Sequence, residues 1–459
     1  MPVKALLDKI DHGFTWMFHG KEPDQRSSST QRPRNYKVLS ILALIALILQ
    51  SGLLFLALFA PGLPYRISRA PAEGLQTPHY IQTLEALTQS PERDAGKTEV
   101  FTNGENFYEA QLTAIRQAQR SINLEAYIVS KGEMAERLAK ALAERARAGV
   151  QVNLLIDAIG AFTLPKSYFS EMIAAGGDLQ WYNPIRFTTW PGVNNRTHRE
   201  LLIIDGKVGF IGGAGWADHW YKGDEDNPRW RDTMVRVEGD SAAGLQSAFA
   251  ENWLESSGEV LTGWDYFPYM KPTITTPALV VASAPTTGLS TKARILFQAL
   301  LASAAKSIYI TTPYYLPDES ARKELIRAKK ERNVDIKIIV PGHKIDHAMT
   351  RSSSRRLYGD VLEAGAKIYE YQPSMIHAKI LIIDGVWSVV GSTNFDSRSF
   401  AINDEVNLAV LDPTLAARLT RDFQKDLSES KEITFEQWKR RPHIERANEW
   451  FFSLLERQQ

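Results

Sequence analysis

The chain of 459 residues has no cysteine. This absence excludes disulfide bonds, thiolate metal sites and a cysteine nucleophile, although it does not choose a redox compartment. A large net charge is also missing, because 54 lysines and arginines nearly balance 53 aspartates and glutamates. Proteins that bind nucleic acid usually carry a strong basic excess, so no nucleic-acid partner is expected and any basic site must be local.

Charge is absent from one long stretch near the N-terminus, residues 38–60, which reads VLSILALIALILQSGLLFLALFA and is followed by Pro61. At about 1.5 Å per residue, a helix of this length spans the hydrocarbon core of a bilayer, which is roughly 30 Å thick. The stretch therefore predicts a transmembrane helix. The alternatives are a buried core helix and a cleaved signal peptide, and 37 preceding residues are too many for an ordinary signal peptide.

Basic residues flank this stretch unequally. Four precede it and two follow it at a comparable distance: Arg26, Arg32, Arg34 and Lys37 before, Arg66 and Arg69 after. The positive-inside rule then predicts a cytoplasmic N-terminal segment at residues 1–37 and an extracytoplasmic body, joined through a connector at residues 61–94. The predicted localisation is the cell membrane, with a single crossing.

The rest of the chain reads as an α/β pattern that occurs twice. Helix, strand, helix and strand are predicted in this order at 107–120, 121–129, 133–149 and 150–157, and again at 293–306, 307–316, 320–332 and 334–342. HRELLIIDG, which begins at His198, is answered by HAKILIIDG, which begins at His377, at an offset of 179. Such self-similarity indicates an internal duplication. Prolines and threonines near Pro277 set the boundary between a first lobe, 95–276, and a second lobe, 277–430.

The second copy of the motif gathers groups that suit a phosphate. His377 and Lys379 are two residues apart before an apolar run, so on a strand their side chains leave the same face. Asp384 begins an Asp-Gly turn, after which the returning strand brings Gly391, Ser392 and Asn394 back toward the histidine. One such motif can be only a buried hairpin, but two copies offer a nucleophile and a general acid for one phosphorus atom.

These residues carry a family resemblance. HAKILIID followed by GSTN is similar to the HxKxxxxD…GSxN signature of the phospholipase D superfamily, and the surrounding sequence resembles its bacterial cardiolipin synthase branch. The resemblance implies two similar lobes, each a mixed sheet flanked by helices, related by pseudo-two-fold symmetry, with both histidines in one cleft. It implies that His198 attacks the phosphodiester, that His377 protonates the leaving alkoxide, and that no metal or cofactor takes part.

The resemblance also assigns roles to other residues. Asp205 and Asp384 are expected to orient and charge-support the histidines, unless each is only the first residue of its turn. Lys379 and Asn394 join the catalytic group, and the substrate-binding residues are expected to be Glu200, Gly391, Ser392 and Glu405. No obvious cluster of metal ligands is present in the sequence.

The first copy departs from the family pattern, which would place lysine at position 200 and asparagine at position 215. The chain has Glu200 and Gly215. A unit charge about 4 Å from a phosphate contributes on the order of 4 kcal/mol at an effective dielectric near 20, so reversing its sign matters. Three readings stay open: Arg196, Arg199 or Lys207 neutralises the glutamate; other groups take over the phosphate grip; or catalysis is lost.

The leading hypothesis is a membrane-anchored phosphatidyltransferase that makes cardiolipin from phosphatidylglycerol through a phosphohistidine, with the bilayer and anionic phospholipids as partners. The alternatives are a hydrolase of phospholipids or another phosphodiester, and a non-catalytic module that binds phospholipid. The C-terminal tail, residues 431–459, is amphipathic and either contacts lipid or packs on the protein; its apolar face comprises Ile444, Trp450, Phe451, Leu454 and Leu455.

Overall fold

The computed structural model describes residues 35–59, 66–67, 74–186, 189, 192–270, 273–285 and 291–453. The predicted cytoplasmic segment lies outside the described residues, apart from its last three positions. The chain divides into two compact units, residues 1–60 and 61–459.

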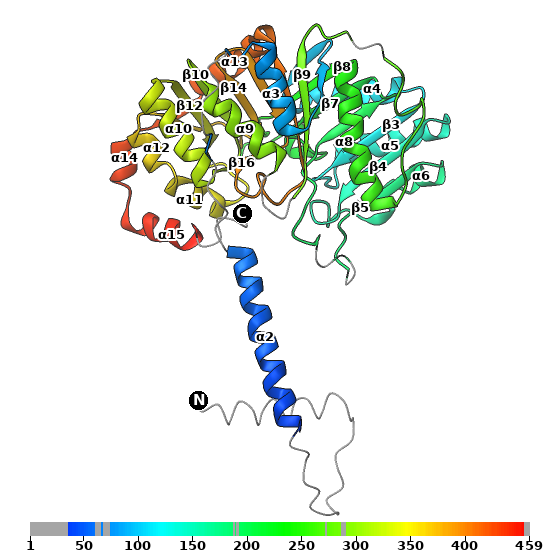
Figure 1. Cartoon of the computed structure of the whole chain (residues 1–459). Coiled ribbons are helices and arrows are strands. Elements are labelled where there is room, and N and C mark those ends of the chain that lie inside the picture. Colours follow the sequence, from blue (N-terminus) through cyan, green and yellow to red (C-terminus); the bar gives the residue numbers. More distant parts are fainter. Residues whose placement is uncertain are drawn as a thin grey trace, which may run out of the picture. The chain divides into compact units, whose positions relative to one another are not determined.

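Helix α2 (Asn35–Phe59) belongs to the first unit and covers the predicted span except for Ala60, which lies outside the described residues (Figure 1). Most of its described apolar side chains are exposed, as Leu42 and Ile48 illustrate at 56% and 61%. Within the described residues, no helix is both long enough and apolar enough to cross a membrane. The transmembrane helix thus stays a prediction.

The second unit is a mixed α/β fold built on two large sheets (Figure 1). The first, in spatial order, consists of β2 (Thr98–Thr102), β8 (Thr233–Glu238), β7 (Val208–Gly212), β6 (Leu201–Ile204), β3 (Ser121–Ala126), β4 (Gln151–Asp157) and β5 (Asp178–Tyr182). The second consists of β1 (Glu92–Asp94), β9 (Pro277–Ser283), β17 (Glu405–Leu411), β15 (Trp387–Gly391), β14 (Ile380–Ile383), β10 (Ser307–Thr311), β12 (Asp335–Pro341), β13 (Lys367–Tyr371) and β18 (Ser430–Ile433). A small parallel pair joins β11 (Tyr315–Leu316) to β16 (Phe395–Asp396).

Seven strands of the second sheet repeat the first sheet in order and direction. From β2 to β3, and from β9 to β10, every neighbouring pair is antiparallel. The next two pairs are parallel in both sheets. The duplication expected from the sequence is therefore visible in the strand topology.

Helices cover both sheets and also lie between them. The helices of the second unit are α3 (Pro78–Thr88), α4 (Gly104–Gln117), α5 (Glu133–Arg147), η1 (Lys166–Phe169), α6 (Ser170–Ala174), α7 (Asp218–Tyr221), α8 (Asp240–Ser257), α9 (Lys292–Ser303), α10 (Glu319–Arg332), α11 (Ala348–Arg356), α12 (Gly359–Glu363), α13 (Pro413–Ser428), α14 (Phe435–Lys439) and α15 (His443–Ser453). α4 and α5 pack on the outer face of the first sheet, and α9 and α10 on the outer face of the second. α8 and α13 share the central core with the inner faces of both sheets.

This layering explains why the inner strands read as unbroken apolar runs. Every residue of β6 and of β14 is buried, because both faces of each sheet are covered. Both predicted Asp-Gly hairpins form: Asp205 and Asp384 adopt φ of 54° and 55°, and the strands pair on either side of each turn. Asp-Gly suits such a turn because both of its central residues take positive φ.

The predicted connector takes part in the core of the second half. Tyr80, Ile81 and Leu84 on α3 pack into the cluster that contains α9 and α10, and β1 extends the second sheet by pairing with β9. The Trp387 Nε1–H group donates a hydrogen bond of 2.7 Å to the carbonyl of Leu75. These contacts were not foreseen, because the segment contains too few apolar residues to predict a strand or a packed helix.

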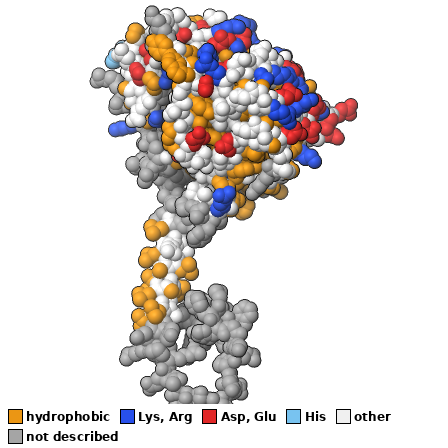
Figure 2. Space-filling model, turned by 90° about the vertical axis from the view of Figure 1, so that its right-hand side faces the viewer, with side chains coloured by type: hydrophobic (Ala, Val, Ile, Leu, Met, Phe, Trp, Pro, Cys, Tyr) orange, Lys and Arg blue, Asp and Glu red, His pale blue; other side chains and the backbone are white. Residues whose placement is uncertain are grey.

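The exposed surface of the first half has the mixed charge that the composition suggests. Figure 2 shows lysine and arginine side by side with aspartate and glutamate on that side of the molecule. The pairs Arg137 with Glu109 and Arg147 with Glu171 on and beside α5 are examples. α5 buries its apolar stripe and presents charge to solvent, as an ordinary surface helix does.

Candidate active site

Both histidines lie at the same edge of their sheets. His198 shortly precedes β6, which runs antiparallel to β3, so it lies at the carboxyl end of β3. His377 stands in the same relation to β14 and β10. At this edge the two halves meet, through isolated bridges between Thr197 and Asp404 and between Arg231 and Ile376.

The backbones of the two halves bind each other beside the histidines in a reciprocal way. The N–H of His198 donates to the carbonyl of Asp404 in the second half at 2.9 Å. The N–H of His377 donates to the carbonyl of Arg231 in the first half at 2.7 Å. Each histidine is therefore held in place by the opposite half, and neither position is complete in one half alone.

The carboxylates beside the histidines are exchanged in the same way. Glu405 Oε1 of the second half lies 3.5 Å from His198 Nδ1, and Asp232 Oδ2 of the first half lies 3.0 Å from His377 Nδ1. Strand pairing shows that these two acids occupy equivalent positions, since Gly212 pairs with Met234 and Gly391 with Asn407, each two residues further on. Glu405 was expected in the substrate-binding group, whereas Asp232 was missed.

The environment favours neutral imidazoles. Burial lowers the pKa of His198 well below its usual range, and the nearby positive charges of Arg398 and Lys379 lower it further. Burial and Lys379 also lower the pKa of His377, but the hydrogen bond and negative charge of Asp232 oppose the shift. Burial acts to raise the pKa of Asp232, but the hydrogen bond from His377 and the charge of Lys379 outweigh it and lower that pKa. The ionised Asp232 leaves His377 better able to carry a proton.

Lys379 reaches the centre of the site from the second half. Its ammonium donates to the carbonyl of Gly213 at 3.2 Å and lies 2.7 Å from His377 Nδ1. Burial lowers the pKa of Lys379, while the nearby charges of Asp232, Glu200 and Glu405 oppose this shift. Because Gly213 belongs to the first half, Lys379 is a further link between the halves.

Glu200 is buried on the first-half side, with 6% of its surface exposed. Its Oε1 accepts hydrogen bonds from the backbone N–H groups of Tyr127 at 3.1 Å and Ile128 at 3.4 Å. Burial raises the pKa of Glu200 well above its usual range, although Lys379 and the two N–H groups act in the opposite direction. A protonated Glu200 does not repel a phosphate as the carboxylate would.

The cations proposed from the sequence to neutralise Glu200 lie elsewhere. Arg196 forms a buried ion pair with Asp157, and Arg199 pairs with Glu251. Lys207 follows the turn at the far end of β6. The prediction that one of these cations neutralises Glu200 is therefore wrong, because Arg196 and Arg199 pair with other acids and Lys207 lies at the far end of its hairpin. The ammonium near Glu200 is that of Lys379.

Packing explains why a glycine stands at position 215. A Cβ atom at this position would lie 2.3 Å from the carbonyl oxygen of Ile128, whose backbone N–H binds Glu200. The same carbonyl accepts a hydrogen bond from Trp216 N–H at 2.8 Å. One segment, residues 127–129, therefore contacts both positions at which the first motif departs from the family pattern.

Asp205 and Asp384 do not reach the histidines. Asp205 accepts hydrogen bonds from the backbone N–H groups of residues 119–121, and Asp384 from those of residues 305–307. Each lies at the opposite end of its hairpin, where its carboxylate holds the start of the neighbouring strand. The expectation that they orient the histidines is corrected: Glu405 and Asp232 lie in that position.

The other predicted residues of the second motif lie behind Glu405 and beside it. Ser392 Oγ donates to Glu405 Oε2 at 2.5 Å, and the backbone of Gly391 leaves no room for a side chain against the carbonyl of Val406. Burial raises the pKa of Glu405 to about 8. Asn394 is buried, and its Oδ1 has no hydrogen-bond partner among the described residues.

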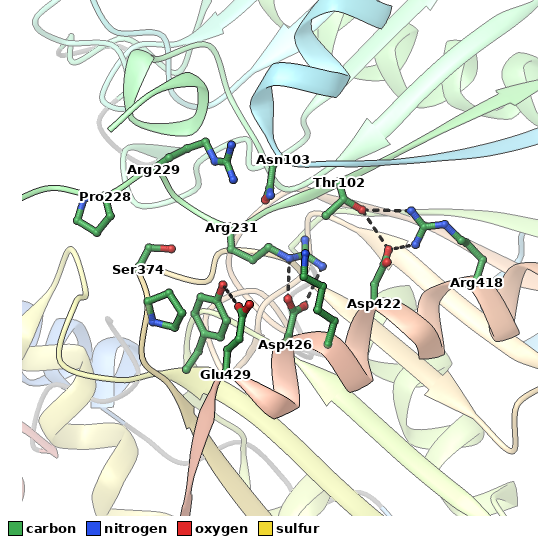
Figure 3. A pocket seen from close by; sticks show the side chains of 13 residues that line it. Thr102, Asn103, Pro228, Arg229, Arg231, Ser374, Arg418, Asp422, Asp426 and Glu429 are labelled. Carbon is green, nitrogen blue, oxygen red and sulfur yellow. Dashed lines mark hydrogen bonds and ion pairs between the residues drawn. The ribbon is translucent and has the colours of Figure 1, made fainter. Parts of the chain in front are cut away.

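A cavity of about 520 Å³ lies between the halves but does not contain the histidines (Figure 3). Arg231 lines this cavity and forms a buried ion pair with Asp426 at 2.8 Å. The next residue in the chain is Asp232, which contacts His377. The cavity is lined by Thr102, Asn103, Pro228, Arg229, Arg231, Tyr371, Pro373, Ser374, Arg418, Asp422, Lys425, Asp426 and Glu429. The described residues contain no group of three or more acidic, histidine or cysteine side chains that would hold a metal ion.

Comparison with known proteins shows the family to which the chain belongs. A family model described as "Cardiolipin synthase, PLD-like domain" matches residues 112–253 and 297–427. Cardiolipin synthase of Geobacillus kaustophilus is 32% identical over 395 residues, which cover 85% of this chain and 78% of that protein. Cardiolipin synthase 1 of Bacillus cereus is 32% identical over 387 residues, which cover 82% of this chain and 75% of that protein.

A solved structure supports the fold at lower sequence similarity. Phosphatidylserine synthase of Haemophilus influenzae superposes with a TM-score of 0.61 at 14% identity, over 82% of this chain and 100% of that chain. The two sheets, the paired histidines and the family match lead to one conclusion: the chain belongs to the cardiolipin synthase branch of the phospholipase D superfamily.

Proposed function

We propose that this protein is a phosphatidyltransferase that joins two phosphatidylglycerol molecules into cardiolipin and releases glycerol. The observation that carries the proposal is the pair of histidines, each beside a carboxylate supplied by the opposite half. Family membership supports the same reaction class. We further propose that the lobes 95–276 and 277–430 are related by a pseudo-two-fold axis that passes near this pair, as the repeated strand order suggests.

The proposed reaction has two displacements at one phosphorus atom. Nδ1 of His198 faces Glu405, so its Nε2 attacks phosphorus; the bond from phosphorus to the glycerol oxygen breaks, and His377 gives that oxygen a proton. The phosphatidyl group is then held on His198. His377 takes a proton from the hydroxyl of a second phosphatidylglycerol, whose oxygen attacks phosphorus and breaks the bond to nitrogen.

The assignment of the two roles rests on the neighbours of each ring. A nucleophilic imidazole must be neutral, and the pKa of His198 is lowered well below its usual range by burial and by Arg398. A general acid must hold a proton until the leaving group departs, and Asp232 supports the imidazolium of His377. Lys379 supplies positive charge for the phosphoryl oxygens.

In this proposal, Glu200 of the first half and the residues of the second motif together bind the phosphate. Protonated Glu200 keeps Oε1 on the backbone of Tyr127 and Ile128, while the other oxygen donates a hydrogen bond toward a phosphoryl oxygen. This is the second of the three readings, in which other groups replace the missing lysine. The raised pKa of Glu200 supports it, because only the protonated acid can donate.

We also propose that residues 38–60 anchor the protein in the cell membrane as a single crossing, with the N-terminus in the cytoplasm and the body outside. The uncharged sequence and the helical course of α2 support the anchor, and the basic residues before it support the orientation. The proposed partners are the bilayer and anionic phospholipids, and no nucleic acid.

The test is to incubate the purified full-length protein with phosphatidylglycerol in mixed micelles containing EDTA and to identify products by mass spectrometry. Cardiolipin and glycerol from the parent, and neither product from His198→Ala or His377→Ala, support the transferase. Phosphatidic acid in place of cardiolipin favours the hydrolase. Binding of phosphatidylglycerol micelles without either product favours the non-catalytic module, in which Glu200 has disabled the site.

A further inference from the structure

Helix α15 (His443–Ser453) exposes most of its apolar side chains, whereas Phe452 is half-buried. Ile444, Trp450 and Phe451 are 73%, 60% and 60% exposed. Ile444, Ala447 and Phe451 follow the i, i+3, i+7 spacing and so form one stripe, with Trp450 beside it. An ordinary surface helix such as α5 has the opposite orientation, with its apolar stripe buried and its charges in water.

Polar contacts attach α15 to the body. Glu449 is the buried residue of the helix, with 3% of its surface exposed, and Arg441 binds its carboxylate at 2.7 Å and 2.8 Å. The Arg441 guanidinium also lies 3.9 Å above the ring of Trp438, whose Nε1–H donates to the carbonyl of Arg355. A helix fixed by a charged side chain is held in one orientation, and here that orientation exposes the stripe.

The exposed stripe lies at the edge of the sheets that carries the histidines. α15 packs on α11, and α11 follows β12 at its carboxyl end. Two exposed apolar side chains of the first half, Phe162 and Ile185, follow β4 and β5 at the carboxyl ends of those strands, and they are 79% and 64% exposed. Apolar groups from both halves therefore project from one edge.

Basic side chains accompany the stripe. Arg440 is 83% exposed and contacts Glu436 only at 3.9 Å, and Arg446 and Lys344 are also exposed. Isolated apolar residues on a surface are common, but a helix with an outward apolar stripe and basic neighbours is typical of a segment that lies in the headgroup region of an anionic bilayer.

We propose that α15, together with Phe162 and Ile185, forms the surface by which the body docks on a bilayer of anionic phospholipid, with the helix axis in the membrane plane. This inference rests on the proposed function for its biological purpose, since a surface at this edge would bring lipid headgroups to the histidines. It makes its own prediction, however, because docking does not require chemistry.

The absence of native cysteine makes a direct depth measurement possible. Single cysteines at Ile444→Cys and Phe451→Cys are spin-labelled in the full-length protein, reconstituted in vesicles of phosphatidylglycerol and phosphatidylcholine or kept in detergent. Two controls are Glu445→Cys, exposed on the same helix outside the stripe, and Gln82→Cys, exposed on α3 at the opposite end of the body. Collisions with oxygen and with a water-soluble nickel chelate report the depth of each label.

In vesicles, the labels at positions 444 and 451 should gain access to oxygen and lose access to nickel, whereas the label at position 82 should stay in water and that at position 445 should lie shallower than the stripe. Stripe labels as accessible to nickel as the label at position 82 would overturn the proposal. Shielding in detergent that grows with protein concentration would also overturn it, by assigning the stripe to a second copy of the chain.

An activity measurement separates this inference from the proposed function. The double variant with Ile444→Ser and Phe451→Ser should make product from long-chain phosphatidylglycerol in vesicles roughly tenfold more slowly, the factor that loss of about 1.4 kcal/mol of apolar burial gives. Its rate on a short-chain, monomeric phosphatidylglycerol should equal that of the parent. Deep labels without any product from the parent would support the docking surface and reject the transferase; an equal loss on both substrates would reject docking as the cause.

Discussion

The two halves share a strand order but offer different groups to the site. The second half contributes Lys379 and a hydrogen-bonded Ser392, whereas the first contributes Glu200 held by two backbone N–H groups. The histidines are shared more evenly, because each is supported by a carboxylate and a carbonyl of the other half. A duplicated motif can thus diverge at individual positions while the exchanged contacts still link both copies.

The acids beside the histidines differ in charge as well as in length. Asp232 has a lowered pKa and is ionised, while Glu405 has a pKa of about 8 and is mostly protonated at neutral pH. An ionised partner stabilises an imidazolium, whereas a neutral one leaves an imidazole free to act as a nucleophile. In the proposed reaction, this difference assigns nucleophilic attack to His198 and proton transfer to His377.

The largest effect, on the rate of cardiolipin formation, is expected from substitutions of the two histidines. A second substrate then distinguishes the role of one histidine from that of the other. Both His198→Ala and His377→Ala should lower cardiolipin formation by about 10⁴-fold or more. With a phosphatidyl ester of p-nitrophenol, whose leaving group needs no proton, His377→Ala should still release p-nitrophenol in a single turnover while His198→Ala should not. Release by His198→Ala and not by His377→Ala would reverse the assignment.

The next largest effect should come from the exchanged carboxylates. Asp232→Asn removes a charge that supports His377 and should lower kcat by roughly 10²-fold to 10³-fold at pH 7. Glu405→Gln replaces an acid that is mostly neutral at that pH and should change kcat by less than about fivefold. Kinetics of both variants from pH 6 to 9 would test this, and equal losses at pH 7 would show that the two acids are equivalent.

The raised pKa of Glu405 also predicts how the stability of the protein changes with pH. The folded-state pKa of Glu405 is raised from 4.5 to about 8, so its proton favours the folded state fully below the ordinary pKa, and this contribution is lost as pH rises toward 8. Relative to the parent, Glu405→Gln should therefore gain stability between pH 5 and pH 9. Urea unfolding at both pH values measures the change, and a constant difference would contradict the raised pKa.

A smaller effect, on the free energy of unfolding, is expected from substitutions of Glu200, which stands where the second motif has Lys379. Glu200→Lys leaves the N–H groups of Tyr127 and Ile128 without an acceptor and buries a second cation near Lys379, so it should destabilise by about 2–4 kcal/mol. Glu200→Gln keeps an acceptor and should stay within about 1 kcal/mol of the parent. An equally stable lysine variant would mean that the segment at residues 127–129 adapts freely.

The smallest effect is expected at Gly215, the second position at which the first motif departs from the family pattern. Gly215→Ala places a Cβ 2.3 Å from the carbonyl of Ile128 and should destabilise by about 1–3 kcal/mol through displacement of that segment. Gly74→Ala is the matched control, since nothing lies within 4 Å of its Cβ. If the two variants unfold alike, the glycine at position 215 is not required by packing.

Much of the fold follows from local patterns. Apolar runs of strand length, amphipathic helices such as Glu133–Arg147 and the two Asp-Gly turns predict an α/β duplication, and the structure has the same order of elements. β1 and α3 escaped prediction because their place depends on the edge and face of a distant sheet. The bilayer span and the exact lobe boundaries stay predictions.

The sequence by itself determined the histidines, the duplication and the two positions where the copies differ, because these are properties of residue types and their spacing. The tertiary structure alone decided which acid faces which histidine. Asp205 and Asp384 belong to the same motif as the histidines, yet a four-residue strand carries each to the far end of its hairpin. Asp232 and Glu405 reach the opposite histidines because the inner faces of the two sheets pack on one shared core, and a contact between segments more than 100 residues apart leaves no local signal in the chain.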